Sequence, residues 1–185
     1  MPSYSRIATR LRVPLGFLFA LAYIWFAHPL WASVLAGCAF ILAGLGIRAA
    51  ASGHIRKNAQ LTTTGPYAYT RNPLYLGSVM MAAGFIVAAR DWWIAAGACV
   101  MFLAIYLPVT LAEEKYLRSA FPQYAEYATE VPRFLPRPTP YRAAGEAGLP
   151  QFSRELYMRH REYNAALGSA VMLAALILKL ILVSH

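Results

Sequence analysis

Long apolar runs without a charged side chain are the feature that most constrains the fold. Five such runs lie at Val13–Ala27, Leu30–Ile47, Pro73–Ala89, Trp92–Ala112 and Ala165–Leu178. A membrane-spanning helix needs about 20 residues, within a range of about 17–25. The second, third and fourth runs meet this length, whereas the first and fifth must recruit flanking residues, with Lys179 snorkelling outward from the fifth. The sequence therefore predicts an all-α, polytopic membrane protein with about five transmembrane helices.

Composition supports the same class and a single domain. Of the 185 residues, 59% are hydrophobic and 14% are charged, whereas soluble domains average about 45–50% apolar and about 25% charged residues. We expect one integral-membrane domain, 1–185, with an N-terminal helical hairpin at 1–52, a core at 53–137, and an amphipathic segment with a final membrane helix at 138–185. Small residues allow close helix packing, and the second run offers Gly37, Gly44 and Gly46.

Basic residues are distributed unevenly between the two sides that five spans would create. All Lys and Arg residues except Arg90 and Lys179 fall on the side that holds the N-terminus. The positive-inside rule therefore predicts a cytoplasmic N-terminus and an external C-terminus. The net charge of +9 suits anionic lipid headgroups. Because this asymmetry is typical of membrane proteins, we expect membrane lipids and no nucleic acid as partners.

Cysteine and histidine positions indicate no metal centre. Cys38 and Cys99 both fall inside apolar runs, where packing is their expected role. The four histidines show no metal-ligand spacing among themselves. The chain also lacks a Walker loop and the GxGxxG and GxSxG motifs. We therefore predict no metal site.

The segment "GPYAYTRNPLYLG", residues 65–77, combines rigid, aromatic and charged residues just before the third run. Gly65 permits a turn, and Pro73 suits the first turn of a helix, where its missing N–H costs nothing. Such a segment can simply be a rigid helix start whose tyrosines lie at the membrane interface. A binding site is the alternative interpretation.

A pair of carboxylates favours the binding site. Glu113 and Glu114 end the fourth run, where adjacent carboxylates are costly unless each has a partner. Arg118, four residues after Glu114, is one possible partner along the helix, and Arg71 is another. A site shared by the two cytoplasmic connections satisfies both Arg71 and the carboxylates.

Two blocks of sequence identify a resemblance. "LTTTGPYAYTRNPLYLG" is followed by "EEKYLRSAFPQYAEYATEVPRFLP", and this order and spacing strongly resembles the isoprenylcysteine carboxyl methyltransferase and phospholipid methyltransferase superfamily of integral-membrane enzymes. The resemblance covers roughly residues 52–136 and makes 53–137 the cofactor-binding methyltransferase core. It implies a cytoplasmic site for S-adenosylmethionine, converted to S-adenosylhomocysteine, and a lipid or membrane-soluble methyl acceptor.

The resemblance also implies roles for individual residues. Arg71, Asn72, Glu113 and Glu114 are candidates for positioning the reactants, and no catalytic base is assigned. Asn72 stands where many relatives have His, so it can exchange hydrogen bonds but cannot become cationic. The implied cofactor-binding residues are His54, Ala59, Gln60, Leu61, Thr62, Tyr67, Asn72, Pro73, Leu74, Tyr75 and Glu113.

One departure from the pattern concerns the methyl acceptor. Isoprenylcysteine enzymes carry an Arg one helical turn before the cofactor-binding Glu, where it helps to hold the substrate carboxylate. Here that position is Val109, which makes a neutral or amine acceptor at least as plausible as a prenylcysteine; Arg133 is the next cation to consider. The alternatives are isoprenylcysteine-type carboxyl methylation, a nicotinamide-dependent membrane reductase of related architecture, and a non-catalytic membrane scaffold.

Overall fold

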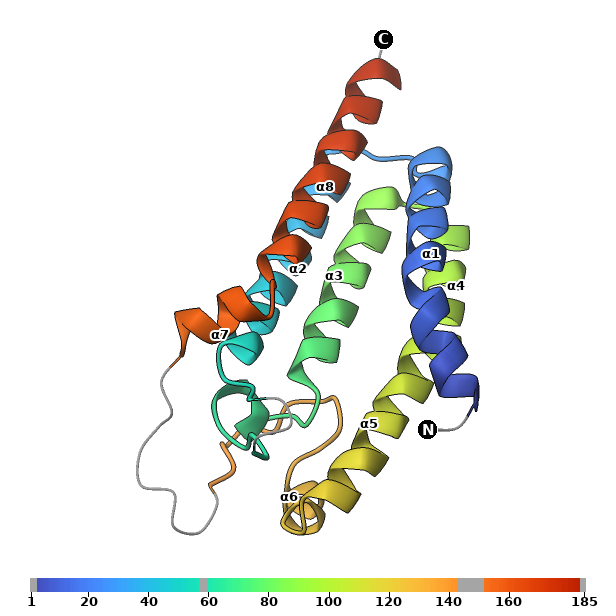
Figure 1. The fold of residues 1–185 in the computed structure, drawn as a ribbon. Coiled ribbons are helices and arrows are strands. Elements are labelled where there is room, and N and C mark those ends of the chain that lie inside the picture. Colours follow the sequence, from blue (N-terminus) through green and yellow to red (C-terminus); the bar gives the residue numbers. More distant parts are fainter. Residues whose placement is uncertain (1–2, 57–59, 143–151, 184–185) are drawn as a thin grey trace.

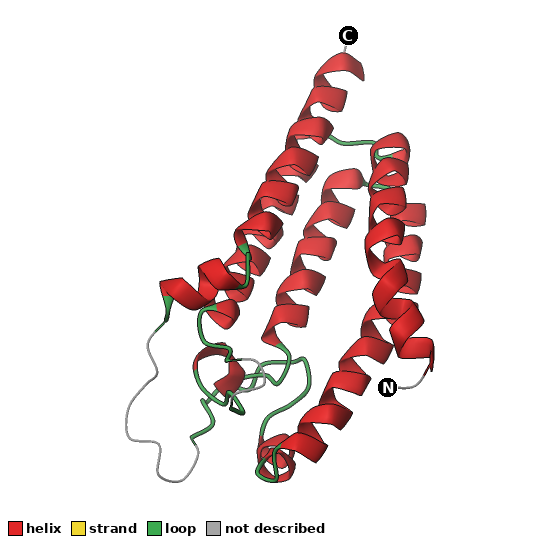
Figure 2. Ribbon diagram, in the orientation of Figure 1, coloured by secondary structure: helices red, strands yellow, loops and turns green. Residues whose placement is uncertain are grey.

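The computed structural model describes residues 3–56, 60–142 and 152–183. Every regular element in these ranges is helical (Figure 1, Figure 2), which confirms the predicted all-α class. The elements are α1 (Ser3–Phe26), α2 (Trp31–Ser52), the 3₁₀ turn η1 (Gly65–Ala68), α3 (Pro73–Ala89), α4 (Trp92–Met101), the π-helical turn η2 (Phe102–Tyr106), α5 (Leu107–Ala120), α6 (Tyr124–Glu130), α7 (Arg154–Arg159) and α8 (Tyr163–Val183).

Three helices within the described ranges are long and apolar enough to cross a membrane. They are α2, the continuous helix Trp92–Ala120 and α8, whereas Pro14–Phe26 and Pro73–Ala89 are shorter apolar helices. The fifth run reaches its length by recruiting residues on both sides, as the sequence predicts. The third run, at 17 residues, belongs to the shorter group. Five spans and a cytoplasmic N-terminus stay predictions.

Glycines bring α2 and α3 into close contact. A Cβ atom added to Gly44 would lie 2.5 Å from the carbonyl oxygen of Gly77, and one added to Gly84 would lie 2.5 Å from that of Gly37. The predicted packing role is therefore confirmed for Gly37 and Gly44. It is wrong for Gly46, which faces open space.

The first two helices follow each other in sequence, and both contact α3 and α8. Figure 1 shows α2 and α8 on one side of α3, with α1 and α4 on the other. Lys179 of α8 crosses to α1, where its ammonium donates to the carbonyl oxygens of Ile24 at 2.7 Å and Trp25 at 2.8 Å. These carbonyls have no partner within their own helix end, so Lys179 caps α1 rather than snorkelling outward.

The long connection after α5 breaks into short elements. The helix that continues beyond the fourth run ends at Ala120, and after the turn at Pro122 the chain forms α6. The predicted amphipathic helix before the fifth run is likewise divided, because Arg161 adopts a left-handed φ of 53° between α7 and α8. This turn redirects the chain from the short α7 into the long α8 (Figure 1).

Candidate functional site

Two residues of the 65–77 segment, Gly65 and Pro73, adopt the conformations that the sequence predicts. Gly65 adopts a φ of 60°, and Pro73 is the first residue of α3. Gly65 is also required sterically, because a Cβ atom there would meet the ring of His54. His54 is held in place by a 2.7 Å contact between its Nδ1 atom and the carbonyl oxygen of Ala50.

The Pro-rich stretch after α6 returns to this segment and fixes its middle. Three backbone N–H···O bonds, each 2.9 Å long, join residues 68–71 to residues 132–141. The Thr70 hydroxyl donates to the carbonyl oxygen of Arg133 at 3.0 Å. The two blocks recognised in the sequence are therefore in direct contact.

The Glu114 carboxylate joins these two blocks to α5. Arg133 Nε donates to its Oε1 atom at 2.9 Å, Arg133 Nη2 donates to its Oε2 atom at 3.0 Å, and Asn72 Nδ2 donates to its Oε1 atom at 3.0 Å. Arg71 Nη1 lies 3.7 Å from Oε2. We call Glu114, Asn72, Arg71 and Arg133 the Glu114 cluster. Only 8% of Glu114 is exposed, so these contacts compensate a buried charge.

The partners of Glu114 are settled by this geometry. Arg71 and Arg118 are the two cations that the sequence predicts to pair with Glu114. Glu114 pairs with Arg71, but its other described ion pair is with Arg133 rather than with Arg118. Arg71 also approaches the Tyr124 hydroxyl, with Nη1 at 3.5 Å. The Nε atom of Arg71 is buried and has no hydrogen-bond partner among the residues that the structure describes. Buried donors without a hydrogen-bond partner are rare in proteins.

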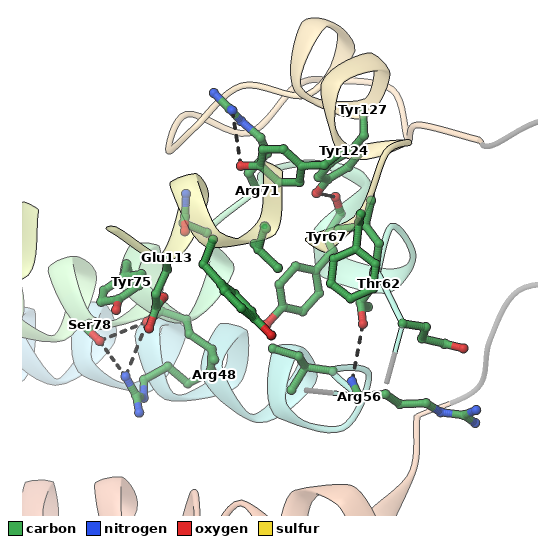
Figure 3. A pocket seen from close by; sticks show the side chains of 18 of the residues that line it. Arg48, Arg56, Thr62, Tyr67, Arg71, Tyr75, Ser78, Glu113, Tyr124 and Tyr127 are labelled. Atoms are coloured by element: carbon green, nitrogen blue, oxygen red, sulfur yellow. Dashed lines mark hydrogen bonds between the residues drawn. The ribbon is translucent and has the colours of Figure 1, made fainter. Parts of the chain in front are cut away.

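A cavity of about 440 Å³ adjoins this cluster, within the range of about 300–1,000 Å³ that is typical of small-molecule sites. Figure 3 shows its side chains converging from α2, the loop that follows it, α3, α5 and α6. The lining residues are Arg48, Ile55, Arg56, Gln60, Leu61, Thr62, Tyr67, Arg71, Asn72, Leu74, Tyr75, Ser78, Tyr106, Glu113, Tyr116, Leu117, Phe121, Tyr124, Tyr127 and Glu162.

Most residues nominated from the sequence meet in this one cavity. Those that line it are Gln60, Leu61, Thr62, Tyr67, Arg71, Asn72, Leu74, Tyr75 and Glu113. Among the others, Pro73 is fully buried at the start of α3, Glu114 faces its cluster, and His54 packs against Gly65 and Phe152. Ala59 lies outside the described residues.

The two residues nominated for the acceptor do not line the cavity. Val109 is half-buried on α5, and the Arg133 guanidinium is bound to Glu114. The hydrogen bond to that carboxylate raises the pKa of Arg133 above its ordinary value. The roles of Val109 and Arg133 in acceptor choice stay predictions.

A second group of polar residues in the cavity carries no sequence signal. Arg48 of α2 binds Glu162, the residue before α8, through Nη2–Oε2, Nη2–Oε1 and Nε–Oε2 contacts of 2.7, 3.0 and 3.1 Å. Its Nη1 atom donates to the Ser78 hydroxyl of α3 at 2.5 Å. We call Arg48, Glu162 and Ser78 the Arg48 cluster. A charge within an apolar helix needs such a partner.

Tyr106 is a further lining residue that the sequence analysis missed. It ends the π-helical turn η2, and its ring meets that of Tyr75 edge-on with the centroids 6.3 Å apart. π-helical turns are rare and frequently occur at functional sites. Pro108, just after the turn, is the only local signal that regular helix geometry is interrupted there.

Buried phenols form the wall nearest α6. The Tyr127 hydroxyl donates to the carbonyl oxygen of Tyr67 at 2.7 Å. Burial raises the pKa of both Tyr67 and Tyr127 above the ordinary value. The two groups therefore stay neutral at physiological pH, and Tyr67 brings a neutral aromatic ring and hydroxyl to the cavity.

Comparison with known proteins shows the class of protein. A family model described as phospholipid methyltransferase matches residues 17–124, which is more than half of the chain. The protein therefore belongs to the phospholipid methyltransferase family, as the resemblance predicts. The match covers all cavity residues except Tyr127 and Glu162. No solved structure matches the chain.

Two curated relatives carry names that describe metal resistance. The chain is 33% identical over 133 residues to the cobalt-zinc-cadmium resistance protein CzcN of Cupriavidus metallidurans, covering 67% of this chain and 62% of that protein. It is 30% identical over 125 residues to the nickel-cobalt-cadmium resistance protein NccN of Alcaligenes xylosoxydans xylosoxydans, covering 63% and 59%. The matches thus span about three fifths of the length of each relative.

Proposed function

We propose that the protein transfers a methyl group from S-adenosylmethionine to a lipid or otherwise membrane-soluble acceptor at the cytoplasmic membrane face. The observation that carries this proposal is the convergence of both sequence blocks on one cavity. Glu113 of the second block and Tyr67, Arg71 and Tyr75 of the first block line it together. Family membership supports methyl transfer as the reaction.

The residues present suit the proposed cofactor. Its carboxylate needs a cationic or N–H donor, and the buried Arg71 Nε atom is an N–H donor without a partner. Its ammonium group needs an acceptor, and Glu113 supplies a carboxylate to the same cavity. Tyr67, Tyr75 and Tyr106 add aromatic surface for the adenine ring. The donor set and the volume therefore fit the cofactor.

The cofactor, when bound, supplies an electrophilic methyl group on a positively charged sulfur. The chain's contribution is to hold the two reactants in line, which can contribute about 7–11 kcal/mol in favourable cases. The Glu114 cluster supports this role by fixing Asn72 and Arg71 relative to α5. The tyrosine-rich wall limits the access of water to the transfer, in which the positive charge of the sulfur passes with the methyl group to a neutral acceptor.

Binding of S-adenosylhomocysteine to the purified protein tests the proposal. Because the ligand binds only the folded state, a concentration 100 times the dissociation constant should stabilise it by about 2.7 kcal/mol. Glu113→Gln should weaken this effect, whereas Glu126→Gln, which neutralises an exposed carboxylate on α6, should not. A shift with NADPH and none with S-adenosylhomocysteine would instead favour the reductase alternative.

Methyl transfer from labelled cofactor into a total lipid extract, with the product identified by mass, tests the acceptor class. A farnesylcysteine analogue assayed in parallel separates carboxyl methylation from transfer to other lipids. If Val109 marks the loss of a carboxylate site, the wild type should methylate the analogue poorly and Val109→Arg should improve this. Labelling of neither class by a protein that binds the cofactor would favour the scaffold alternative.

A further inference from the structure

A second, smaller cavity of about 230 Å³ lies between α2 and the α7–α8 pair. It is lined by Leu45, Gly46, Arg48, Ala49, Tyr157, Glu162 and Ala166. Arg48 and Glu162 also line the larger cavity. The ion pair of the Arg48 cluster is therefore common to both spaces, and we call the smaller one the α2–α8 groove.

Gly46 of α2 lines the groove and contributes open space to it. A Cβ atom added to Gly46 would have no neighbour within 4 Å in the described part of the chain, in contrast to Gly37 and Gly44, which are packed against α3. Gly46 is therefore not needed for helix packing. Its missing side chain leaves open space beside the α2 backbone.

The groove is lined by both polar and apolar residues. Arg48, Glu162 and Tyr157 are its polar residues, whereas the remaining lining residues are Leu45, Gly46, Ala49 and Ala166. Gly46 and Ala166 are exposed, and they lie on two of the helices that are long enough to span a membrane. A molecule with a small polar end and an apolar chain matches this distribution of chemistry.

We infer that the α2–α8 groove binds the apolar chain of the methyl acceptor, with the acceptor's polar end at the Arg48–Glu162 pair. This inference rests on the proposed function, since it names where that reaction's second substrate is held. Because the same pair borders the larger cavity, an amphiphile in the groove brings its polar end to the edge of the cofactor site. Glu162 lies beyond the residues matched by the family model, so this part of the site belongs to the chain's own C-terminal region.

Filling the groove tests this inference without touching the larger cavity. Gly46→Leu places a side chain in the open space, and Gly168→Leu is the matched control, because Gly168 also lies on a helix with nothing within 4 Å and does not line the groove. The full chain is reconstituted in phosphatidylcholine vesicles that contain a phosphatidylethanolamine with a diazirine in its acyl chain. After irradiation, adducts are mapped to peptides by mass spectrometry.

We expect wild-type adducts on residues 45–49 and 157–166. Gly46→Leu should reduce them about tenfold, equivalent to about 1.4 kcal/mol of lost binding, and Gly168→Leu should leave them unchanged. Ala166→Phe closes the groove from the α8 side, so it decides the question should Gly46→Leu fail to fold. Equal labelling of the wild type and both groove variants, or loss of labelling in the Gly168→Leu control as well, would overturn the inference.

Two further measurements separate this inference from the proposed function. Stabilisation by S-adenosylhomocysteine should be the same in wild type, Gly46→Leu and Gly168→Leu, since none of these changes touches a cofactor-facing residue. In Gly46→Leu, methyl transfer into the lipid extract should decrease together with the yield of photoadducts. In Gly168→Leu neither should change. If S-adenosylhomocysteine does not stabilise the wild type, the proposed function is wrong. The adduct pattern still decides whether the groove binds an amphiphile.

Discussion

The two charged clusters beside the cavity differ in how completely their charges are matched. In the Glu114 cluster, two guanidinium groups share one buried carboxylate, and the Arg71 Nε atom keeps no partner. In the Arg48 cluster, one guanidinium meets one carboxylate through three contacts, and a hydroxyl takes up another donor. The first cluster has an excess of positive charge, whereas the second is balanced.

The clusters also connect different parts of the fold. The Glu114 cluster ties two loops to the middle of α5, beside the larger cavity. The Arg48 cluster ties α2 and α3 to the residue before α8, on the side of the groove. Substitutions that disrupt the Glu114 cluster should therefore differ from those that disrupt the Arg48 cluster in their effects on stability and on ligand binding.

The largest expected effect comes from Glu114→Ala. Removing this carboxylate leaves the mostly buried Arg71 and the 41% exposed Arg133 without their anion. Breaking a buried pair costs about 3–5 kcal/mol. The free energy of unfolding in detergent micelles measures this loss, with Glu126→Ala as the control for an exposed carboxylate. A loss no larger than that of the control would show that the Glu114 cluster contributes little to stability.

Arg48→Met should have a smaller effect, because the balanced pair is less buried. The side chains of Arg48 and Glu162 are 22% and 14% exposed, compared with 12% and 10% for Arg71 and Glu114. Losing hydrogen bonds to a charged group costs about 1.5–3 kcal/mol. Combining Arg48→Met with Glu162→Gln should cost less than the sum of the two single changes, and strict additivity in a double-mutant cycle would contradict a direct pair.

The same two clusters show what the sequence could and could not predict. Asn72 and Arg71 lie within a recognisable segment, and Glu114 ends an apolar run, where a charge requires a partner. Their meeting in space follows from a pattern that spans about sixty residues. Arg48 and Glu162 are 114 residues apart, and each alone is typical of a helix end. No local rule selects one as the partner of the other, because the helix packing decides it.

The positions of the helices could be predicted from local sequence, whereas their packing could not. Apolar runs predicted every long helix, since length and composition are local properties. The groove side of the site was missed because Gly46 looked like Gly37 and Gly44 in sequence. Whether a glycine faces a neighbouring helix or open space depends on the direction in which α2 presents it.

Lys179→Met sharpens the comparison by loosening α8 at the opposite end from the Arg48 cluster. The ammonium caps the end of α1 through two carbonyl oxygens, and polar contacts between membrane helices contribute about 0.6 kcal/mol on average, up to about 1.7 kcal/mol. We expect a loss of about 1 kcal/mol in unfolding free energy and no change in stabilisation by S-adenosylhomocysteine. Weakened ligand binding would mean that α8 as a whole, rather than its Glu162 end, supports the site.

Tyr127→Phe probes the neutral wall between the charged clusters and should have an effect no larger than that of Lys179→Met. The variant loses the hydrogen bond to the Tyr67 carbonyl oxygen, which contributes about 1 kcal/mol. Burial raises the pKa of Tyr127 in the folded state, so the unfolded chain releases this proton first as the pH passes about 10. Above this pH the folded state still holds the Tyr127 proton that the unfolded chain has released. The free energy of unfolding of the wild type therefore falls as the pH rises further.

The difference in unfolding free energy between wild type and Tyr127→Phe should therefore be constant from about pH 7 to 9 and should shrink above about pH 10. Denaturant titrations across this range measure it. If the difference in unfolding free energy between wild type and Tyr127→Phe instead widens at alkaline pH, the folded state accommodates the Tyr127 phenolate. The wall would then hold a charge as the Glu114 cluster does, and the contrast between a neutral aromatic surface and the charged groups beside it would be lost.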